Sequence, residues 1–307
     1  STYNADFDGD EMNIHIPQSL AAKAELQNLI SVSKNTVNCH GKSIFEPVQD
    51  TCAGIYKVTD LKTMLSKEDV FQIVMQLDDA VICETAALRL KDVELDELVQ
   101  ASILVELILP IKFIFIYKNE VLIRNGRFEH LRRLDKTLFK TILLEMTLQL
   151  GDQVTMKFFY HIGRMMSYFV SEIFGLTCSI DDFKVFEKEK QVFDTLLNQI
   201  ETHSTQFKTS KQQLLSLNQA SNLLFHKDVI NGTNFAKEPT SNFALMINSK
   251  SKGKKFNIQS ISGCLAQQVI DGKQPEALGD DKLPGFIKNS YLSGLNVKEM
   301  TYHLAAA

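Results

Sequence analysis

Three aspartates stand at alternate positions near the start of the sequence, in the string Asn4-Ala5-Asp6-Phe7-Asp8-Gly9-Asp10. Carboxylates this close repel one another when all are ionised, and a hard divalent cation relieves that repulsion. Mg²⁺ takes oxygen ligands and is typically held by a few carboxylates together with waters and phosphate oxygens. Gly9 allows the backbone to turn so that the side chains converge. The cluster therefore predicts a site for Mg²⁺ and for phosphate chemistry.

Two other interpretations of the cluster stay open on these residues alone. An EF-hand loop also carries acidic residues at its first, third and fifth places. Counted from Asp6, however, Gly9 stands fourth instead of sixth, and Pro17 stands twelfth, where a bidentate Glu is needed. A solvated acidic turn between two strands is the third interpretation, and it needs no metal.

Composition limits the class of protein. With 307 residues, of which 44% are hydrophobic and 23% charged, the chain can bury the cores of two or three domains. The net charge of −4 excludes a globally basic nucleic-acid binder, so any polyanion must be bound locally. The five cysteines form no C-x-x-C pair, which predicts no zinc site and no disulfide framework. They indicate reduced, mostly buried thiols in an intracellular protein.

The chain shows no sign of a membrane span or a leader. Its most apolar stretch, Ala101 to Tyr117, is interrupted by Glu106, Pro110 and Lys112 and is too short to span a bilayer. It begins without an initiator Met or a signal-peptide pattern. We therefore expect a segment of a larger protein, and whether Ala305 to Ala307 is native sequence stays open.

Hydrophobic periodicity predicts the elements that position the cluster. Alternation predicts a half-buried strand at Met12 to Ile16, ended by Pro17. Further strands are predicted at Ile103 to Leu109, Lys112 to Tyr117 and Val121 to Arg124. Helical spacing predicts helices at Leu20 to Ile30, Lys67 to Ala87 (capped by Ser66), Leu138 to Leu150, Thr155 to Phe174 (ended by Gly175), Asp181 to Thr202, Ser210 to His226 and Phe243 to Ile247.

The residues from Tyr3 to Ser19, YNADFDGDEMNIHIPQS, closely resemble the signature of the largest subunit of multisubunit DNA-dependent RNA polymerases. Three later segments resemble the same family in the same order. They are Pro47 to Gly54 (P-x-Q-D-x-x-x-G), Ser251 to Lys273 (S-K-G, N-I-x-Q and Q-Q-x-x-x-G-K), and Phe286 to Leu295 with His303, which lead into the family's bridge helix. Two departures are a short link from Gly272 to Phe286 and the lack of a Met-Gly-Gly at the end. The first of these favours a compact polymerase of the large-DNA-virus type.

The resemblance implies an α+β chain with four parts. Residues 1–55 would be the end of a double-psi β-barrel active-site domain that carries the metal loop. Residues 56–178 would be a mixed pore domain, residues 179–285 a mainly helical funnel domain, and residues 286–307 the lead into the bridge helix. Between about Thr59 and Asn248 the resemblance is in order and length only.

The resemblance also implies roles for single residues. Asp6, Asp8 and Asp10 would be the catalytic ligands of a permanent Mg²⁺, and a second Mg²⁺ would arrive with the NTP. Asn4 would lie near the sugar hydroxyls of the NTP, although a turn-forming Asn is an equally good interpretation. Lys252, in the basic run from Lys250 to Lys255, would attract NTPs near the pore, unless the run is merely solvated.

The function implied is DNA-templated RNA synthesis by nucleotidyl transfer, within a multisubunit assembly. The expected partners are the second-largest and other polymerase subunits, the DNA template, the RNA transcript, NTPs, and cleavage or elongation factors at the funnel, with no membrane. The expected location is intracellular: the nucleus, or the cytoplasm and virion for a viral protein. The alternative is a non-catalytic pore and funnel scaffold that docks transcription factors or partner subunits. Three clashing carboxylates argue against the scaffold, because docking does not require them.

Overall fold

The computed structural model describes residues 5, 8–94, 97–179, 182, 194–195, 197–199, 202 and 241–306. The chain divides into two compact units, each described by itself here. Unit 1 comprises Ser1–Leu176 with Asn248–Ser251, and unit 2 comprises Thr177–Ile247 with Lys252–Ala307. Within the described ranges, no helix has both the length and the apolar character that crossing a membrane requires.

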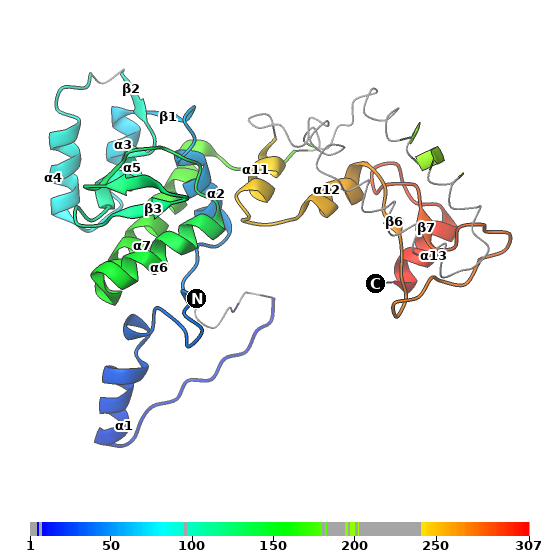
Figure 1. Ribbon diagram of the computed structural model, residues 1–307, viewed down its shortest axis with the longest axis horizontal. Helices are drawn as coiled ribbons and strands as arrows, with labels where there is room; N and C mark the ends of the chain where they lie inside the picture. The colour runs from blue at the N-terminus through cyan, green and yellow to red at the C-terminus, as the bar shows by residue number, and fades with distance from the viewer. Residues whose placement is uncertain are drawn as a thin grey trace. The chain divides into compact units, whose positions relative to one another are not determined.

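Three helices form the centre of unit 1: α2 (Gln49–Val58), α6 (Lys136–Leu150) and α7 (Asp152–Tyr168) (Figure 1). α7 packs against both of the others and continues into the π-helical turn η3 (Phe169–Phe174). The turn ends at Gly175, whose φ of 63° is left-handed, as is usual for a glycine after a helix. The predicted helices at 138–150 and 155–174 and the Gly175 cap are therefore confirmed.

A second group of elements surrounds α7. Strand β1 (Met64–Ser66) pairs antiparallel with β2 (Leu98–Gln100), and Ser66 then caps α3 (Lys67–Val74) in a capping box with Asp69. The prediction of one continuous helix from 67 to 87 was wrong, because the structure has two helices there. The chain leaves the helix after Val74, and Asp79 caps a separate helix, α4 (Ala80–Arg89).

The prediction of a strand at 103–109 was wrong, because these residues form helix α5 (Ile103–Ile108). Leu104, Val105 and Leu107 are all buried, and a short, mostly apolar run does not distinguish a strand from a buried helix. The two following strands are confirmed as β3 (Phe115–Tyr117) and β4 (Glu120–Arg124). With β5 (Arg127–Phe128) they form an antiparallel sheet in the order β3-β4-β5.

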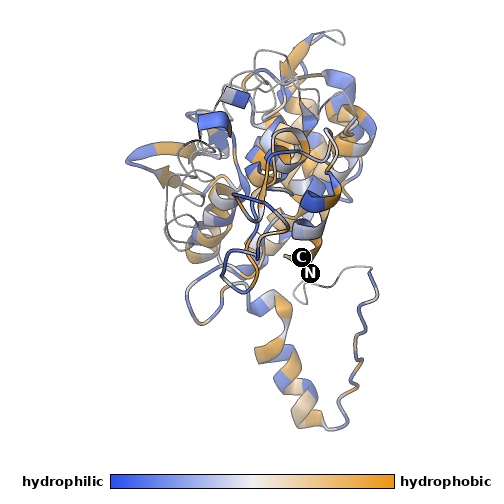
Figure 2. Ribbon diagram, turned by 90° about the vertical axis from the view of Figure 1, so that its right-hand side faces the viewer, coloured by the Kyte–Doolittle hydropathy of each residue, from blue (hydrophilic) through white to orange (hydrophobic). Residues whose placement is uncertain are grey.

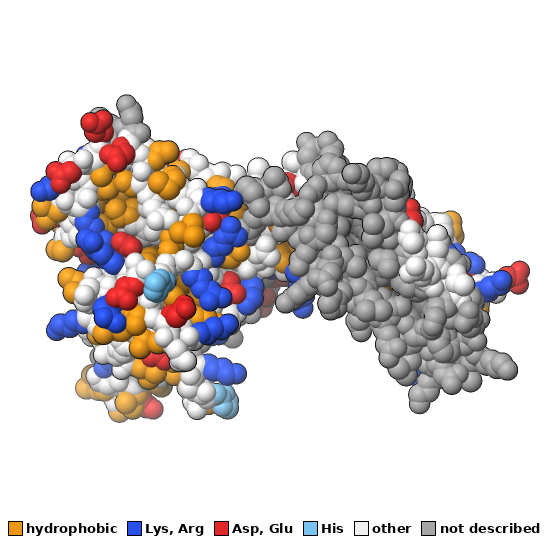
Figure 3. Space-filling model, turned by 45° about the horizontal axis from the view of Figure 1, so that its top comes forward, with side chains coloured by type: hydrophobic (Ala, Val, Ile, Leu, Met, Phe, Trp, Pro, Cys, Tyr) orange, Lys and Arg blue, Asp and Glu red, His pale blue; other side chains and the backbone are white. Residues whose placement is uncertain are grey.

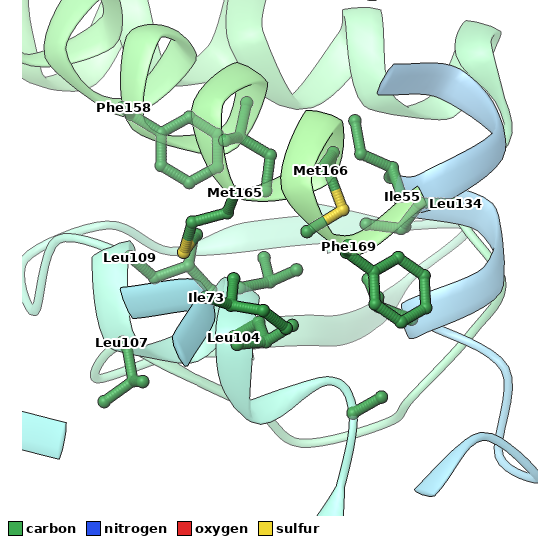
Figure 4. Close-up of a cluster of buried hydrophobic side chains, with 14 of the residues drawn as sticks. Ile55, Ile73, Leu104, Leu107, Leu109, Leu134, Phe158, Met165, Met166 and Phe169 are labelled. Carbon is green, nitrogen blue, oxygen red and sulfur yellow. The ribbon is translucent and has the colours of Figure 1, made fainter. Parts of the chain in front are cut away.

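One hydrophobic cluster holds these elements of unit 1 together. Figure 4 shows Phe158, Met165 and Met166 of α7 extending toward side chains of the neighbouring elements, among them Ile73 of α3 and Leu104 of α5. All five side chains are buried. Burial of side chains of this size is the main favourable contribution to folding.

The N-terminal segment of unit 1 carries apolar residues that the described chain leaves uncovered (Figure 2). The predicted half-buried strand at 12–16 was wrong for the described chain, since Met12, Ile14 and Ile16 are 56%, 93% and 70% exposed and form no strand. A strand needs a paired neighbour, and none of the described residues pairs here. The predicted helix at 20–30 is confirmed as α1 (Leu20–Glu25) and the π-helix η1 (Leu26–Ile30), followed by η2 (Val32–Lys34).

Unit 2 contains α12 (Lys255–Ser262), the strand pair β6 (Ala266–Gln267) and β7 (Phe286–Ile287), and α13 (Val297–Ala305). Leu265, Ile287 and Tyr302 form its described core. The predicted helix at 243–247 is confirmed as α11 (Asn242–Asn248). The predicted helices at 181–202 and 210–226 lie outside the residues that the structure describes, save for scattered positions. The described chain mixes helices with small antiparallel sheets, while the double-psi β-barrel and the four-part domain layout stay predictions.

Candidate metal loop and the segments around it

The structure describes part of the predicted metal loop. Asp8, Gly9 and Asp10 are exposed, and the φ of Gly9 is 120°, which favours glycine. A Cβ built on Gly9 would meet no atom within 4 Å, so open space surrounds the turn there. Asn4 and Asp6 lie outside the described residues. Among the residues that are described, no group of three or more His, Cys, Asp or Glu side chains is arranged to hold a metal. The convergence of the three aspartates therefore stays a prediction.

The residues present nevertheless suit a hard divalent cation. Asp8 and Asp10 offer carboxylate oxygens, the donors that Mg²⁺ prefers, and both side chains are exposed. Exposure leaves room for the waters and phosphate oxygens that complete the coordination of Mg²⁺. A Ca²⁺ loop of the EF-hand type is disfavoured by the sequence, since Pro17 occupies the place of the bidentate Glu.

Threonine hydroxyls link the chain that follows the metal loop to helices α6 and α7 of unit 1. Thr36 is 1% exposed, and its hydroxyl donates to a carboxylate oxygen of Asp152 at the start of α7. The same hydroxyl lies 3.4 Å from that of Thr147, which in turn lies 3.2 Å from the hydroxyl of Thr155. Nothing in the sequence indicated this contact, because isolated threonines in a polar loop have no distinctive spacing. The contact sets where the segment that carries the metal loop leaves the core.

The P-x-Q-D-x-x-x-G segment forms the beginning of α2. The thiol of Cys52 donates to the carbonyl of Pro47 at 2.9 Å, and burial raises the pKa of this thiol to about 12. Cys52 is therefore a protonated packing residue and no nucleophile. Gly54 faces α7 so closely that an added Cβ would lie 3.0 Å from Cβ of Met166. The glycine thus lets α2 pack closely on α7.

The cysteines agree only in part with the prediction of buried thiols. Cys52 and Cys264 are buried and Cys83 is half-buried, whereas Cys39 and Cys178 are exposed. All five are free thiols. Burial raises the pKa of Cys264 to about 11, so this thiol is also protonated at neutral pH.

The predicted basic run is divided in the structure. Lys250 Nζ lies 2.8 Å from the carboxylate of Asp135 and 2.8 Å from the hydroxyl of Thr137, both at the start of α6. Lys252 and Lys254, by contrast, are exposed. Lys250 is therefore a structural contact of unit 1, and the role of Lys252 in binding NTPs stays a prediction.

The two glutamines of the Q-Q-x-x-x-G-K stretch contact backbone. The side-chain amide of Gln267 donates to the carbonyls of Gln268 and Pro284, at 2.7 and 3.1 Å. The side-chain amide of Gln268 donates to the carbonyl of Leu265 at 3.0 Å. Both side-chain amides therefore hold the backbone around β6 and the chain that leads into β7. The last motif residue, His303, lies on α13, and its Nε2 is 3.0 Å from the hydroxyl of Tyr291.

Comparison with known proteins agrees with this arrangement of motifs. The family model "RNA polymerase Rpb1, domain 2" matches residues 1–32, and the model "RNA polymerase Rpb1, domain 3" matches residues 36–183. DNA-directed RNA polymerase subunit 1 of Acanthamoeba polyphaga mimivirus is 28% identical over 334 aligned residues, which cover 99% of this chain. The alignment covers 22% of that relative, so the chain spans about a fifth of its length.

Proposed function

We propose that this chain, which belongs to the family of RNA polymerase largest subunits, supplies the metal loop, pore and funnel of a DNA-directed RNA polymerase. The observation that carries the proposal is the string Asn4 to Asp10 inside the match to domain 2 of that subunit. The enzyme would be a nucleotidyltransferase that adds NTPs to the 3′ end of RNA, and it would be active only as a complete assembly.

Asp6, Asp8 and Asp10 are the proposed ligands of the catalytic Mg²⁺. Together their carboxylates supply a charge of −3, which a divalent ion does not fully offset, so the loop retains affinity for a second Mg²⁺ brought by the NTP. When bound, the two ions activate the RNA 3′ hydroxyl and neutralise charge on the phosphates of the NTP. The role of the loop is to hold the ligands in one place, for which the left-handed turn at Gly9 is suited.

Two further residues are proposed to bind the NTP. The amide of Asn4 can donate to and accept from the sugar hydroxyls, a capacity that a carboxylate or an ammonium group lacks. The exposed Lys252 attracts the triphosphate and raises its local concentration. No side-chain nucleophile is required, and the described cysteines with resolved pKa shifts are all shifted toward the protonated thiol.

The four-part layout belongs to the same proposal. Residues 1–55 would close the active-site domain, residues 56–178 would form the pore, residues 179–285 the funnel, and residues 286–307 the start of the bridge helix. The partners would be the second-largest and other subunits, template DNA, transcript RNA and NTPs, with cleavage or elongation factors at the funnel. A viral relative favours a cytoplasmic or virion polymerase over a nuclear one.

Cleavage of the chain by metal-generated radicals tests where the ion binds. With Fe²⁺ in place of Mg²⁺ in the complete polymerase, we expect radical cleavage within a few residues of Asp8, because Fe²⁺ also accepts carboxylate ligands. Asp10→Asn should abolish that cleavage. Glu25→Gln removes a negative charge from the same exposed N-terminal segment and should leave the cleavage intact. Cleavage at other sites only, or cleavage that survives Asp10→Asn, would favour the scaffold alternative.

A further inference from the structure

Two arginines face each other across a tight turn of unit 1. Arg124 ends β4 and Arg127 begins β5, and the two are paired directly in the antiparallel register. Asn125 and Gly126 form the turn between them, with φ values of 53° and 70°. Positive φ at both central residues is the mark of a type I′ turn, the connection that suits a two-residue hairpin. Like charges directly opposite each other destabilise a strand pair, so this arrangement needs an explanation.

The hairpin that carries the arginines is fixed in place. A Cβ added to Gly126 would lie 3.1 Å from the carbonyl of Leu109, so the turn packs closely on the end of α5. The N–H of Phe128 donates to the carboxylate of Glu106 at 3.1 Å, and the N–H of Glu129 donates to the carbonyl of Leu122 at 2.9 Å. The arginines are thus presented on a rigid support, which lowers the entropy cost of binding a ligand.

The carboxylates nearby do not balance these charges. Glu129 pairs with Nε of Arg124 at 3.1 Å, and Glu106 pairs with Arg89 at 3.4 Å. Arg127 is exposed and has no ion pair within the described part of the chain. Burial lowers the pKa of Arg89 and the positive charge of Arg127 lowers it further, while Glu106 raises it. Three arginines therefore share two carboxylates at this hairpin.

More basic side chains lie along the chain that follows β5. His130 and Arg132 are exposed, and the guanidinium group of Arg132 stacks over the ring of Tyr117 at 5.3 Å. The ammonium group of Lys118 lies over the same ring at 5.5 Å. Figure 3 shows Lys and Arg side chains interspersed with Asp and Glu on the face of unit 1 that it presents. Arg127, Arg132 and Lys118 thus place exposed positive charge on and beside the β3-β4-β5 sheet.

We propose that the hairpin of Arg124 and Arg127 binds the phosphate backbone of a nucleic-acid strand. The inference rests on the proposed polymerase function, which supplies such a strand. A guanidinium group presents a planar fork of donors that matches the oxygens of a phosphate, and it stays charged at any physiological pH. Directly paired residues hold their Cα atoms roughly 5.5 Å apart, so the two forks can contact one phosphate or two neighbours on the same strand. A bound phosphate removes the repulsion between the arginines.

Salt dependence of binding tests the proposal in the complete polymerase. Wild type and Arg127→Ala are compared for their affinity for an RNA–DNA scaffold from about 50 to about 300 mM salt. We expect several-fold weaker binding by the variant at low salt and a slope of log affinity against log salt that is shallower by about one. Arg127→Lys should restore part of the affinity and part of the salt slope. Lys91→Ala removes one exposed positive charge elsewhere in unit 1 and should change neither the affinity nor the salt slope.

Separate measurements distinguish failure of this proposal from failure of the proposed function. At limiting scaffold, Arg127→Ala should extend less primer than wild type, and a higher scaffold concentration should restore extension, because the hairpin binds nucleic acid and takes no part in the chemistry. Single-stranded RNA and single-stranded DNA, used as competitors, show which strand the hairpin holds. If affinity and salt slope match those of Lys91→Ala, the proposal is overturned. It is equally overturned if the variant keeps scaffold binding and instead loses a subunit, which would assign the hairpin to an acidic protein partner.

Discussion

The carboxylate of Glu299 holds both the backbone and the side chain of Asn289. Oε1 accepts from the backbone N–H of Asn289 at 3.2 Å, and Oε2 accepts from its side-chain amide at 2.8 Å. The same carboxylate accepts from the backbone N–H groups of Lys288 and Asn296, at 3.2 and 3.0 Å. Glu299 is 7% exposed, so these four donors take the place of water around its charge. The start of α13 is thereby fixed to the chain that leaves β7.

Glu299→Gln is expected to destabilise unit 2. The change replaces one accepting oxygen by a donor that faces other N–H groups, and it removes the charge that strengthens the remaining bonds. A loss of about 1 to 3 kcal/mol in the free energy of unfolding is expected. Urea unfolding measures it, and Glu276→Gln, at an exposed carboxylate of the same unit, is the control. Equal stability of the two variants would contradict the role assigned to Glu299.

Gly54→Ala is expected to destabilise unit 1 by about 1 to 3 kcal/mol, because the new methyl group overpacks the contact between α2 and α7. Its Cβ would lie 3.0 Å from Cβ of Met166 and 3.1 Å from Cγ2 of Val170. Gly163→Ala is the matched control, since a Cβ there meets no atom within 4 Å. That second change is expected to be neutral or stabilising, as Ala favours a helix by up to about 1 kcal/mol over Gly. Thermal unfolding that ranks the two variants in the opposite order would refute this account of the packing.

Unit 1 is expected to lose stability as the pH falls from about 7 to about 5. His161 is 6% exposed, and burial lowers its pKa in the folded state, although Asp79 at 3.9 Å opposes this and Lys157 adds to it. Below the unfolded pKa of about 6.5, the unfolded chain binds a proton that the folded chain resists. The loss of stability therefore grows as the pH falls and becomes constant once the pH is below the folded pKa. The pKa of Asp79 is lowered by its hydrogen bond with Lys157, so Asp79 stays ionised over this range.

His161→Gln tests that pH dependence. Glutamine does not titrate, so the slope of unfolding free energy against pH should become flatter between about pH 7 and about pH 5. His130→Gln, at an exposed histidine of the same unit, should leave the slope as in wild type. An unchanged slope in the first variant would exclude His161 as the titrating group.

Lys252→Ala in the complete polymerase is expected to raise the KM for NTPs modestly, and more at low than at high salt. Lys252 is exposed, and salt screens charges of this kind over roughly 10 Å at ~0.1 M. Steady-state extension at several salt concentrations measures the effect, with Lys91→Ala as a charge-matched control. A KM that is the same at every ionic strength would make Lys252 a merely solvated residue.

Local signals in the sequence predicted most of the described helices of unit 1, although not α2, and of its described strands only β3 and β4. Ser66 with Asp69, and Gly175 in a left-handed conformation, mark helix ends through contacts within a few residues, so their spacing is visible in the sequence. The apolar run at 103–109 was misassigned because its burial on several faces depends on neighbours distant in sequence. The strand expected at 12–16 requires partner strands that the described chain does not contain.

The candidate site, too, has features that the sequence predicts and contacts that it does not. The acidic string is contiguous, so its chemistry was predictable without a structure. The ion pair of Lys250 with Asp135 joins residues more than a hundred positions apart, and no spacing rule indicates it. The same holds for Thr36 with Asp152 and for the close approach of Gly54 to Met166. These long-range contacts arise from packing, which a single sequence does not display.

Asp8→Asn in the complete polymerase tests the central proposal most directly. Asparagine keeps the size of the side chain but removes one negative charge from the Mg²⁺ ligands, so metal affinity should fall sharply. Relief of repulsion among the aspartates should leave assembly intact. The measurement is primer extension on a preassembled RNA–DNA scaffold with Mg²⁺, beside a gel shift on the same scaffold, with Glu25→Gln as control. The account predicts loss of extension with scaffold binding retained, whereas extension near the wild-type rate would show that Asp8 is no catalytic ligand.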